Sequence, residues 1–352
     1  MRPIILLAPL LLLAGCAAPS TAYTVAPPEA VAQEAAQQEQ MINSGKYARY
    51  ASHAPASPST RFPDQQRLVA VTERVLIAAA PYCNGHTMPA YAVSVGTADY
   101  GPPSVINAAG GLKPNDRVIG IDGRDVPGGP QGWLFLNQVA SQAAAMNQPV
   151  SLTALRGRQQ VTEQYPVVAA CAFDIALDNN NVWNAYADGH TIHVEQRLLS
   201  DVTNDDDLAF VIAHELSHNI LSHVSKQQQN VMAGAAAGLA VEAIIAGLGG
   251  GQMNGNIAKA GAGVGGASYS QEFEREADYV GLYIMAGTGY DLEAGPRIAR
   301  RIAEQDPRAI RYASSHPSSA DRAASLQATI REIQQKMATG APLVPNAAQK
   351  RS

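Results

Sequence analysis

Apolar and polar residues change their distribution several times along the N-terminal third of the chain. In residues 1–15 an apolar run follows Arg2, a pattern typical of an export signal that is too short to remain as a membrane-spanning helix. Residues 16–62 are rich in Ala, Pro, Gln and Ser, and they predict a flexible tether. Apolar residues return at helical spacing in residues 63–83, where we expect the first helix of a folded domain.

In residues 84–170 short apolar runs alternate with Gly, Pro, Asn and Asp, which indicates strands joined by turns. The stretch "GLKPNDRVIGIDG", which begins at Gly111, resembles the signature of bacterial PDZ domains, with Asn115 where glycine is usual. Asparagine tolerates a left-handed backbone, so the turn can be retained. A helix and a hairpin pattern follow in the order that a PDZ domain requires. We therefore expect a PDZ-like β-rich insertion, and the alternative is a generic β-rich insertion.

The pattern in residues 171–340 predicts a mainly helical domain with a small sheet. Strand patterns cover residues 172–177, 184–189 and 191–199, and helical patterns begin at Asn204, near Gln271 and at Ser318. Three acidic residues follow Asn204 and favour a helix start there, because they complement the helix dipole. A polar tail occupies residues 341–352. The chain as a whole is therefore predicted to be α+β, with the β-rich insertion between the first helix and the rest of the helical domain.

Residues 229–266 are dominated by Gly and Ala and carry Glu242 within an apolar run. Ala and Gly contribute little free energy to membrane transfer, so we do not expect this segment to span a bilayer. We expect a mobile flap or a membrane-facing loop near the active site.

Length and charge narrow the class of protein. The chain has 352 residues, which is enough for one large domain or two ordinary domains. Its 25 Lys and Arg against 30 Asp and Glu give a net charge of −5, which argues against a nucleic-acid partner.

The chain has 3 cysteines, and export determines how they are interpreted. Leu13-Ala14-Gly15-Cys16 resembles the lipobox of bacterial lipoproteins, in which the cysteine is acylated and becomes the new N-terminus. Ala17 after it favours the outer membrane, so we expect a lipid anchor at the periplasmic face of that membrane. Cys83 and Cys171 flank the insertion and would form a disulfide in an oxidising compartment. Two buried free thiols are the alternative.

The helix that begins at Asn204 carries His214, Glu215 and His218 in the pattern H-E-x-x-H. Residues four apart share one helix face, so both imidazoles can bind one Zn²⁺ while Glu215 reaches the water on the metal. A catalytic zinc site needs a third protein ligand. His223 lies about 140° round the helix from His218, which makes it a poor third ligand.

A second helical stretch, "SQEFEREADYVGLYIMA", offers a carboxylate as the third ligand. Glu274 and Asp278 are four residues apart, so Glu274 can bind zinc while Asp278 accepts the outer N–H of a ligand histidine. Glu272 and Glu276 are rival ligands, but neither has an aspartate four residues later.

These motifs, with the preceding "NAYADG" and the later "SHPSSADR", make the chain similar to metallopeptidase family 48, a gluzincin family. The resemblance covers about residues 184–322. It implies one Zn²⁺ per chain, held by His214, His218 and Glu274. It also implies that Glu215 is the general base and acid, and that His316 and Arg322 assist. For His316 and Arg322, a helix cap and a surface arginine are the alternatives.

The resemblance implies a zinc endopeptidase of the bacterial envelope that cleaves exported or misfolded proteins with a zinc-activated water. Unfolded or extended polypeptides would be its substrates, bound beside the strand at Asn184 to Asp188. The PDZ-like insertion would present substrates or bind envelope partners, and Cys16 would hold the protein on the membrane. The alternative is a zinc-retaining chaperone or substrate-binding lipoprotein with little proteolysis.

Overall fold

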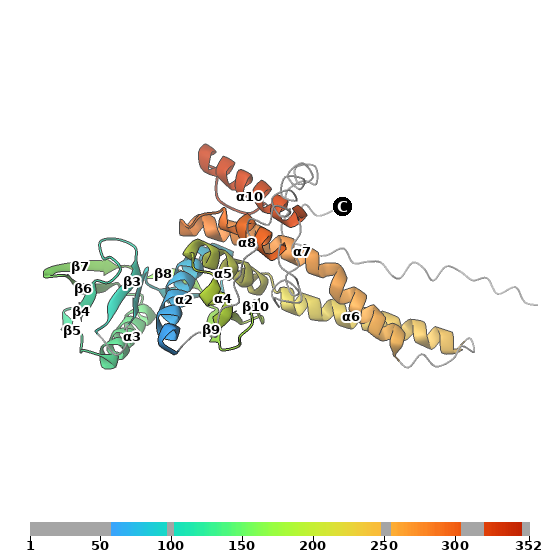
Figure 1. Cartoon of the computed structure of the whole chain (residues 1–352), viewed down its shortest axis with the longest axis horizontal. Coiled ribbons are helices and arrows are strands. Elements are labelled where there is room, and N and C mark those ends of the chain that lie inside the picture. Colours follow the sequence, from blue (N-terminus) through green and yellow to red (C-terminus); the bar gives the residue numbers. More distant parts are fainter. Residues whose placement is uncertain (1–57, 97–101, 248–254, 304–319, 347–352) are drawn as a thin grey trace, which may run out of the picture.

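A computed structural model describes residues 58–96, 102–247, 255–303 and 320–346 (Figure 1). Within these ranges the fold is α+β, as the pattern predicts. The expected lipidation site Cys16, most of the expected tether, and His316 lie outside the described residues.

Helices form the larger part of the described molecule. Their bounds are α2 (Pro58–Ala79), α4 (Gln196–Asp201), α5 (Asp205–Ile220), α6 (His223–Gly247), α7 (Asn256–Thr288), α8 (Ala294–Ala303) and α10 (Ala320–Thr339), with a short 3₁₀ turn η2 (Ala80–Tyr82). A three-stranded sheet, in the order β10 (Ala185–Ala187), β11 (Thr191–Glu195), β9 (Asp174–Asp178), lies beside them. This order places β10 at an edge of the sheet, and β11 is antiparallel to β10 and parallel to β9.

One hydrophobic core joins the helices to this sheet. It includes Val75, Ile192, Phe210, Ile212, Leu216, Val280, Leu282 and Leu326. Helix α5 lies at its centre, because every residue from Asp207 to Ile220 is buried. A helix surrounded on all sides needs apolar residues on all its faces, so the few polar side chains that α5 buries require specific partners.

The segment between Cys83 and Cys171 has its own sheet and its own core. The sheet runs β2 (Val93–Gly96), β3 (Ser104–Ala108), β4 (Arg117–Ile121), β6 (Val150–Arg156), β7 (Gln159–Tyr165), and β5 (Arg124–Asp125) pairs with β4. Helix α3 (Pro130–Ala145) packs against it. The second core includes Val105, Leu112, Val118, Ile121, Leu136, Val139 and Leu152. This segment lies at one end of the molecule in Figure 1.

The turn before β4 adopts the backbone expected for its asparagine. Asn115 has a φ of 72°, in the left-handed region that asparagine tolerates better than other non-glycine residues. The buried carboxylate of Asp116 next to it accepts hydrogen bonds from the Arg156 guanidinium of β6, at 2.9 and 2.6 Å. The turn is thereby tied to the neighbouring strand β6.

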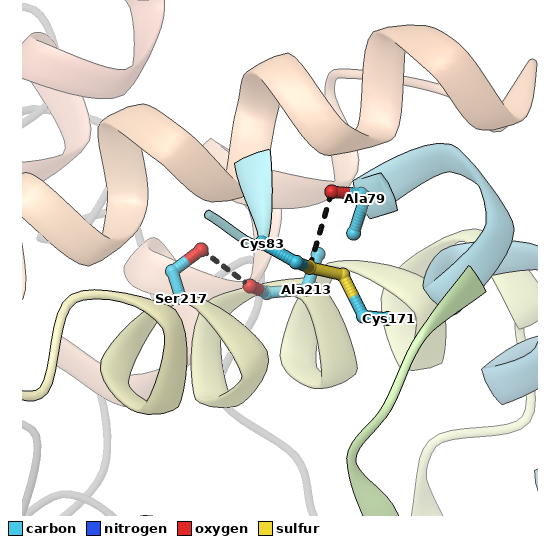
Figure 2. The surroundings of a disulfide bond; sticks show 5 residues. All are labelled: Ala79, Cys83, Cys171, Ala213 and Ser217. Atoms are coloured by element: carbon cyan, nitrogen blue, oxygen red, sulfur yellow. Dashed lines mark hydrogen bonds between the residues drawn. A yellow bond between two sulfur atoms is a disulfide. The ribbon is translucent and has the colours of Figure 1, made fainter. Parts of the chain in front are cut away.

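A disulfide joins Cys83 to Cys171 at the base of this segment (Figure 2). The antiparallel pair β1 (Thr87–Ala90) and β8 (Val168–Cys171) lies next to it, with Thr87 opposite Cys171. Both cysteines are buried in the main core. Ala213 and Ser217 of α5 belong to the surroundings of the bridge, so the disulfide lies against the helix that carries the H-E-x-x-H motif.

The Gly/Ala-rich segment differs from the expectation. Residues 229–247 belong to helix α6, where we expected a mobile flap or a loop. Helix α7 begins at Asn256, earlier than the helix start expected near Gln271. The two helices form a hairpin that extends away from the body (Figure 1). A Cβ at Gly238 would lie 2.4 Å from the carbonyl oxygen of Ile257, so glycine allows this close approach. The Glu242 carboxylate accepts the backbone N–H groups of Gly255, Ile257 and Ala258, which caps the start of α7.

Helix α6 is also long and apolar enough to cross a membrane. Among the described residues it is the one helix that meets this test of length and composition, over His223–Ala246, with 6% of the apolar window buried.

A second difference concerns the strand pattern at residues 191–199. The strand ends at Glu195, and Leu198 and Leu199 lie in α4. Leu198 and Leu199 are adjacent, and both are buried. In a strand with one exposed face, one of two adjacent side chains would point to solvent, because successive side chains point to opposite faces.

Candidate metal centre

The centre lies where α5 packs against α7. Helix α5 begins at its cap Asn204, whose side chain accepts the backbone N–H of Asp206 at 2.9 Å. Three acidic residues follow in the first turn, as expected for a helix N-terminus. A Cβ at Gly281 of α7 would lie 3.4 Å from the backbone of Ala213 and His214, so the two helices are nearly in backbone contact there.

The structure brings His214, His218 and Glu274 together. The two histidine Nε2 atoms are 3.1 Å apart. The Glu274 carboxylate lies 3.3 Å from Nε2 of His214 and 3.4 Å from Nε2 of His218. All three potential ligand atoms lie within 4.8 Å of one another, and all three residues are buried.

The chemistry of this donor set fits zinc. Two imidazole nitrogens and one carboxylate oxygen are a ligand set of catalytic zinc sites, which leave a fourth position open. Because the facing Nε2 atoms and the carboxylate are electron-rich and shielded from water, a cation among them would compensate their mutual repulsion. The three side chains could therefore hold one Zn²⁺.

Asp278 and Arg322 lie directly behind these ligands. The Asp278 carboxylate is 2.9 Å from Nδ1 of His214, on the side of the ring away from Nε2. The Arg322 guanidinium donates two hydrogen bonds to Asp278, at 2.6 and 2.9 Å, and its Nη1 is 3.1 Å from Glu274. One buried cation thus neutralises part of the charge of two buried carboxylates.

Burial and these charges shift the pKa values of the centre. Burial favours the neutral form of Asp278, but Arg322 and His214 outweigh it and hold the pKa of Asp278 below its usual value. Burial also favours neutral His214, yet Glu274 and Asp278 outweigh it and raise the pKa of His214. Burial dominates at His218 and lowers its pKa. The negative field of the two carboxylates therefore acts most strongly on His214.

Glu215 is fully buried on α5, adjacent in sequence to His214 and three residues before His218. A carboxylate at this position of an H-E-x-x-H helix is placed to exchange a proton with a water molecule on the metal.

Sequence reasoning missed the arrangement behind His218. His223 is the first residue of α6, and its Nδ1 lies 3.0 Å from Nδ1 of His218. Its Nε2 lies 3.1 Å from the Glu276 carboxylate. Glu276 thus contacts His223 and is not one of the three clustered residues that could hold a metal. The closeness of His218 and His223 in the sequence was the one signal of this contact. It does not reveal which ring nitrogen of His218 faces His223.

Asn219 was also missed, and it connects α5 to the edge strand. Its side-chain oxygen accepts the N–H of Gly189 at 2.8 Å, and its amide nitrogen donates to the carbonyl of Thr191 at 3.3 Å. These bonds hold the turn between β10 and β11 next to the residue that follows His218. No spacing in the sequence indicates this role.

An H-E-x-x-H helix that faces a carboxylate from a second helix resembles the metal site of metallopeptidases of the gluzincin class. Residues 159–330 match the model of Peptidase family M48. This part of the chain is therefore a family M48 peptidase domain, which confirms the resemblance noted in the sequence.

Curated relatives carry names of the same class. The chain is 30% identical over 155 residues to a "Beta-barrel assembly-enhancing protease" of Yersinia pestis, which covers 41% of this chain and 30% of the relative. It is 24% identical over 194 residues to the protein of that name in Escherichia coli K12, a match that covers 53% of this chain and 39% of the relative. It is 30% identical over 160 residues to "Mitochondrial metalloendopeptidase OMA1" of Schizosaccharomyces pombe, a match that covers 43% of this chain and 44% of the relative. The matches span less than half the length of each relative.

Proposed function

We propose that the protein is a zinc-dependent endopeptidase of the bacterial envelope that cleaves exported or misfolded polypeptides. The observation that carries this proposal is the buried cluster of His214, His218 and Glu274, with Glu215 on the same helix as the two histidines. Beta-barrel assembly and metalloendopeptidase activity in the names of the relatives support an envelope peptidase.

Each residue of the centre has a role in peptide hydrolysis. A bound zinc ion would polarise the scissile carbonyl and increase the acidity of a water molecule. Glu215 would take a proton from that water and later return it to the leaving amine. Asp278 would hold His214 in the tautomer whose Nε2 is free to bind the metal, since its carboxylate lies 2.9 Å from Nδ1 of that ring and would favour a proton there. Arg322 would keep Asp278 and Glu274 ionised and oriented.

An extended substrate would bind along β10. This strand is at the edge of its sheet, and Asn219 links its turn to α5 beside His218. Backbone groups on the free side of an edge strand can pair with an extended peptide of many sequences. Such pairing would favour unfolded polypeptides, with broad specificity.

The other parts of the chain would bring the enzyme to its substrates. Acylated Cys16 would anchor the protein at the periplasmic face of the outer membrane. The segment with sheet β2-β3-β4-β6-β7 and helix α3 would be a PDZ-like domain that presents polypeptides or binds envelope partners; its antiparallel sheet, its separate core and the turn at Asn115 support this interpretation.

The test compares casein degradation by wild type and Glu215→Gln. We expect kcat/KM to fall by about 100-fold or more in the variant, because general base catalysis is lost. Zinc content should stay at one ion per chain in both. Glu272→Gln is the matched control, since Glu272 pairs with Arg275 at the surface and should retain full activity.

Two results would contradict the proposal. A wild-type protein that binds no zinc would exclude this metal chemistry. A protein that binds zinc but degrades casein no faster than Glu215→Gln would favour the alternative, a zinc-retaining chaperone or substrate-binding lipoprotein.

A further inference from the structure

We infer that His223 and Glu276 are positioning residues that orient the zinc ligand His218 through a chain of hydrogen bonds. This inference rests on the proposed function, and it assigns a task to two side chains that bind no metal themselves. His223 is 2% exposed and Glu276 is fully buried, so both carry a desolvation cost that needs compensation by specific partners.

The first step of the argument is the direction of the hydrogen bonds. The metal-binding side of His218 is Nε2, which faces Nε2 of His214, so its Nδ1 faces His223 at 3.0 Å. When Nε2 keeps its lone pair for a metal, a neutral His218 carries its proton on Nδ1 and donates it to Nδ1 of His223. His223 then carries its own proton on Nε2 and donates it to Glu276, 3.1 Å away. Every donor in the chain has an acceptor.

The second step is the hydrogen-bonding capacity of His223. Its Nδ1 lies 3.0 Å from Nδ1 of His218 and its Nε2 lies 3.1 Å from the Glu276 carboxylate, so each ring nitrogen has a partner. A neutral imidazole has one donor and one acceptor, which is what a relay between His218 and Glu276 requires.

The third step is rigidity. The ring of His223 stacks on Phe273, with centroids 4.4 Å apart and an angle of 14° between planes. Phe273 and Glu276 both lie in α7, the helix that also provides Glu274. The relay therefore joins His218 of α5 to α7 through the first residue of α6, and it fixes the ring plane of His218 relative to the third ligand.

The two ligand histidines thus have analogous support of different length. His214 contacts the carboxylate of Asp278 directly, whereas His218 reaches the carboxylate of Glu276 through an intervening imidazole. Outer partners of this kind orient the ring, fix its tautomer and raise its basicity toward the metal. Loss of such a partner typically weakens metal affinity by about 10- to 100-fold.

The experiment measures zinc affinity by competition with a chromophoric chelator, in the full chain. We expect His223→Leu and Glu276→Leu each to weaken zinc binding by about 10- to 100-fold. The double variant should bind zinc no more weakly than the poorer single variant, because both residues act along one route. Combining His223→Leu with Asp278→Asn should instead multiply the two losses, because Asp278 acts on His214.

Two milder variants test whether the effect is specific. Glu276→Gln keeps an acceptor for His223 and removes the charge, so we expect a smaller loss of zinc affinity than in Glu276→Leu. The visible absorption of the Co²⁺-substituted protein should change in His223→Leu and stay close to wild type in Glu276→Gln. Tyr283→Phe is the stability control, because it removes a partly buried hydrogen bond from α7 to Glu332 and should leave both measurements unchanged.

Zinc affinity within about twofold of wild type in folded His223→Leu and Glu276→Leu would overturn the inference, because the known effect of such partners is larger. So would an unchanged affinity in folded His223→Ala and Glu276→Ala if the leucine variants do not fold. This outcome is distinct from failure of the proposed function. A wild-type protein that binds zinc without cleaving casein refutes the peptidase proposal and still allows the relay to be measured.

Discussion

Single side chains in this molecule act chiefly by compensating buried charge. Asp278 and Glu274 are both buried, and the guanidinium of Arg322 contacts both. A buried carboxylate without such a partner would shift toward its neutral form, and neutral Glu274 would be a weaker zinc ligand. The cation that compensates these carboxylates is distant in the sequence, since Arg322 lies 44 residues after Asp278.

Glu73 shows the opposite case, a carboxylate whose burial is incompletely compensated. It lies on α2 and accepts a hydrogen bond from Ser94 of β2, where the insertion meets the helical domain. Burial raises the pKa of Glu73 to about 7, although the hydrogen bond from Ser94 partly opposes this. The two residues line a cavity of about 330 Å³, which also borders Thr288 at the end of α7.

The Glu73 pKa predicts a dependence of stability on pH. The folded state binds this proton more tightly than the unfolded chain, whose glutamate titrates near 4.5, so the free energy of unfolding falls as pH rises from 4.5 to 7. Relative to Glu73→Gln, wild type should lose up to about 3 kcal/mol between pH 4.5 and 8. Denaturant titrations at several pH values measure this difference. A constant difference across the range would contradict the assignment.

At the scale of elements, the contact between α5 and α7 controls the metal centre. Two of the proposed ligands come from α5 and the third from α7, so a shift of one helix changes the distance between them. Small residues allow the close contact, since Ala277 is fully buried and Gly281 lies against the backbone of Ala213 and His214. The helices are therefore held at a separation that larger side chains cannot accommodate.

This packing predicts different effects for two substitutions at one position. Gly281→Ala should be tolerated, because its Cβ would be in ordinary contact at 3.4 Å and alanine favours a helix. Gly281→Leu should lower the free energy of unfolding by about 1–3 kcal/mol through overpacking. It should also weaken zinc binding, since Glu274 would move away from the histidines. Denaturant titration and chelator competition test both parts, and equal zinc affinity in the two variants would contradict the second.

The hairpin of α6 and α7 shows why helices in the Gly/Ala-rich segment were harder to predict than the side chains that could bind a metal. Gly lowers helix propensity, and residues 229–266 contain many glycines. The two helices stabilise each other through close packing at Gly238 and through the cap formed by Glu242. These contacts join residues that are 13 to 20 positions apart, which single-residue propensities cannot include.

At the scale of the whole molecule, the disulfide links the insertion to the helical domain. Cys83 follows α2, and Cys171 ends β8. The bridge spans 88 residues of sequence and lies against α5 near Ala213. It therefore closes the loop that contains the insertion and packs behind the helix that carries two of the proposed metal ligands.

Removal of the bridge should destabilise the protein. In the chain-entropy account a loop of this length contributes about 4–5 kcal/mol, and disulfides typically deliver about 2–4 kcal/mol, so Cys83→Ala with Cys171→Ala should lower the free energy of unfolding by about 2–5 kcal/mol. Wild type with a reductant should approach the double variant, and the double variant should not respond to the reductant. Alkylation of either cysteine in unreduced, unfolded wild type would show that the bridge is absent.

Much of the centre could be identified from local spacing. In a helix, residues four positions apart share a face, so the sequence alone indicated that His214 and His218 could bind together and that Glu274 and Asp278 could face one partner. Asn204 and the acids after it indicated where α5 begins. These features depend on interactions within one or two helical turns, which the sequence encodes directly.

Tertiary structure alone decided how the separate helices meet. The sequence indicated that His223 is a poor third ligand, but only the start of α6 beside α7 showed that it contacts His218 and Glu276. Likewise Asn219 acquired its role from a turn about thirty residues away along the chain. Contacts between residues 30 to 53 positions apart depend on the angles at which packed elements cross, and those angles result from the burial of the whole core.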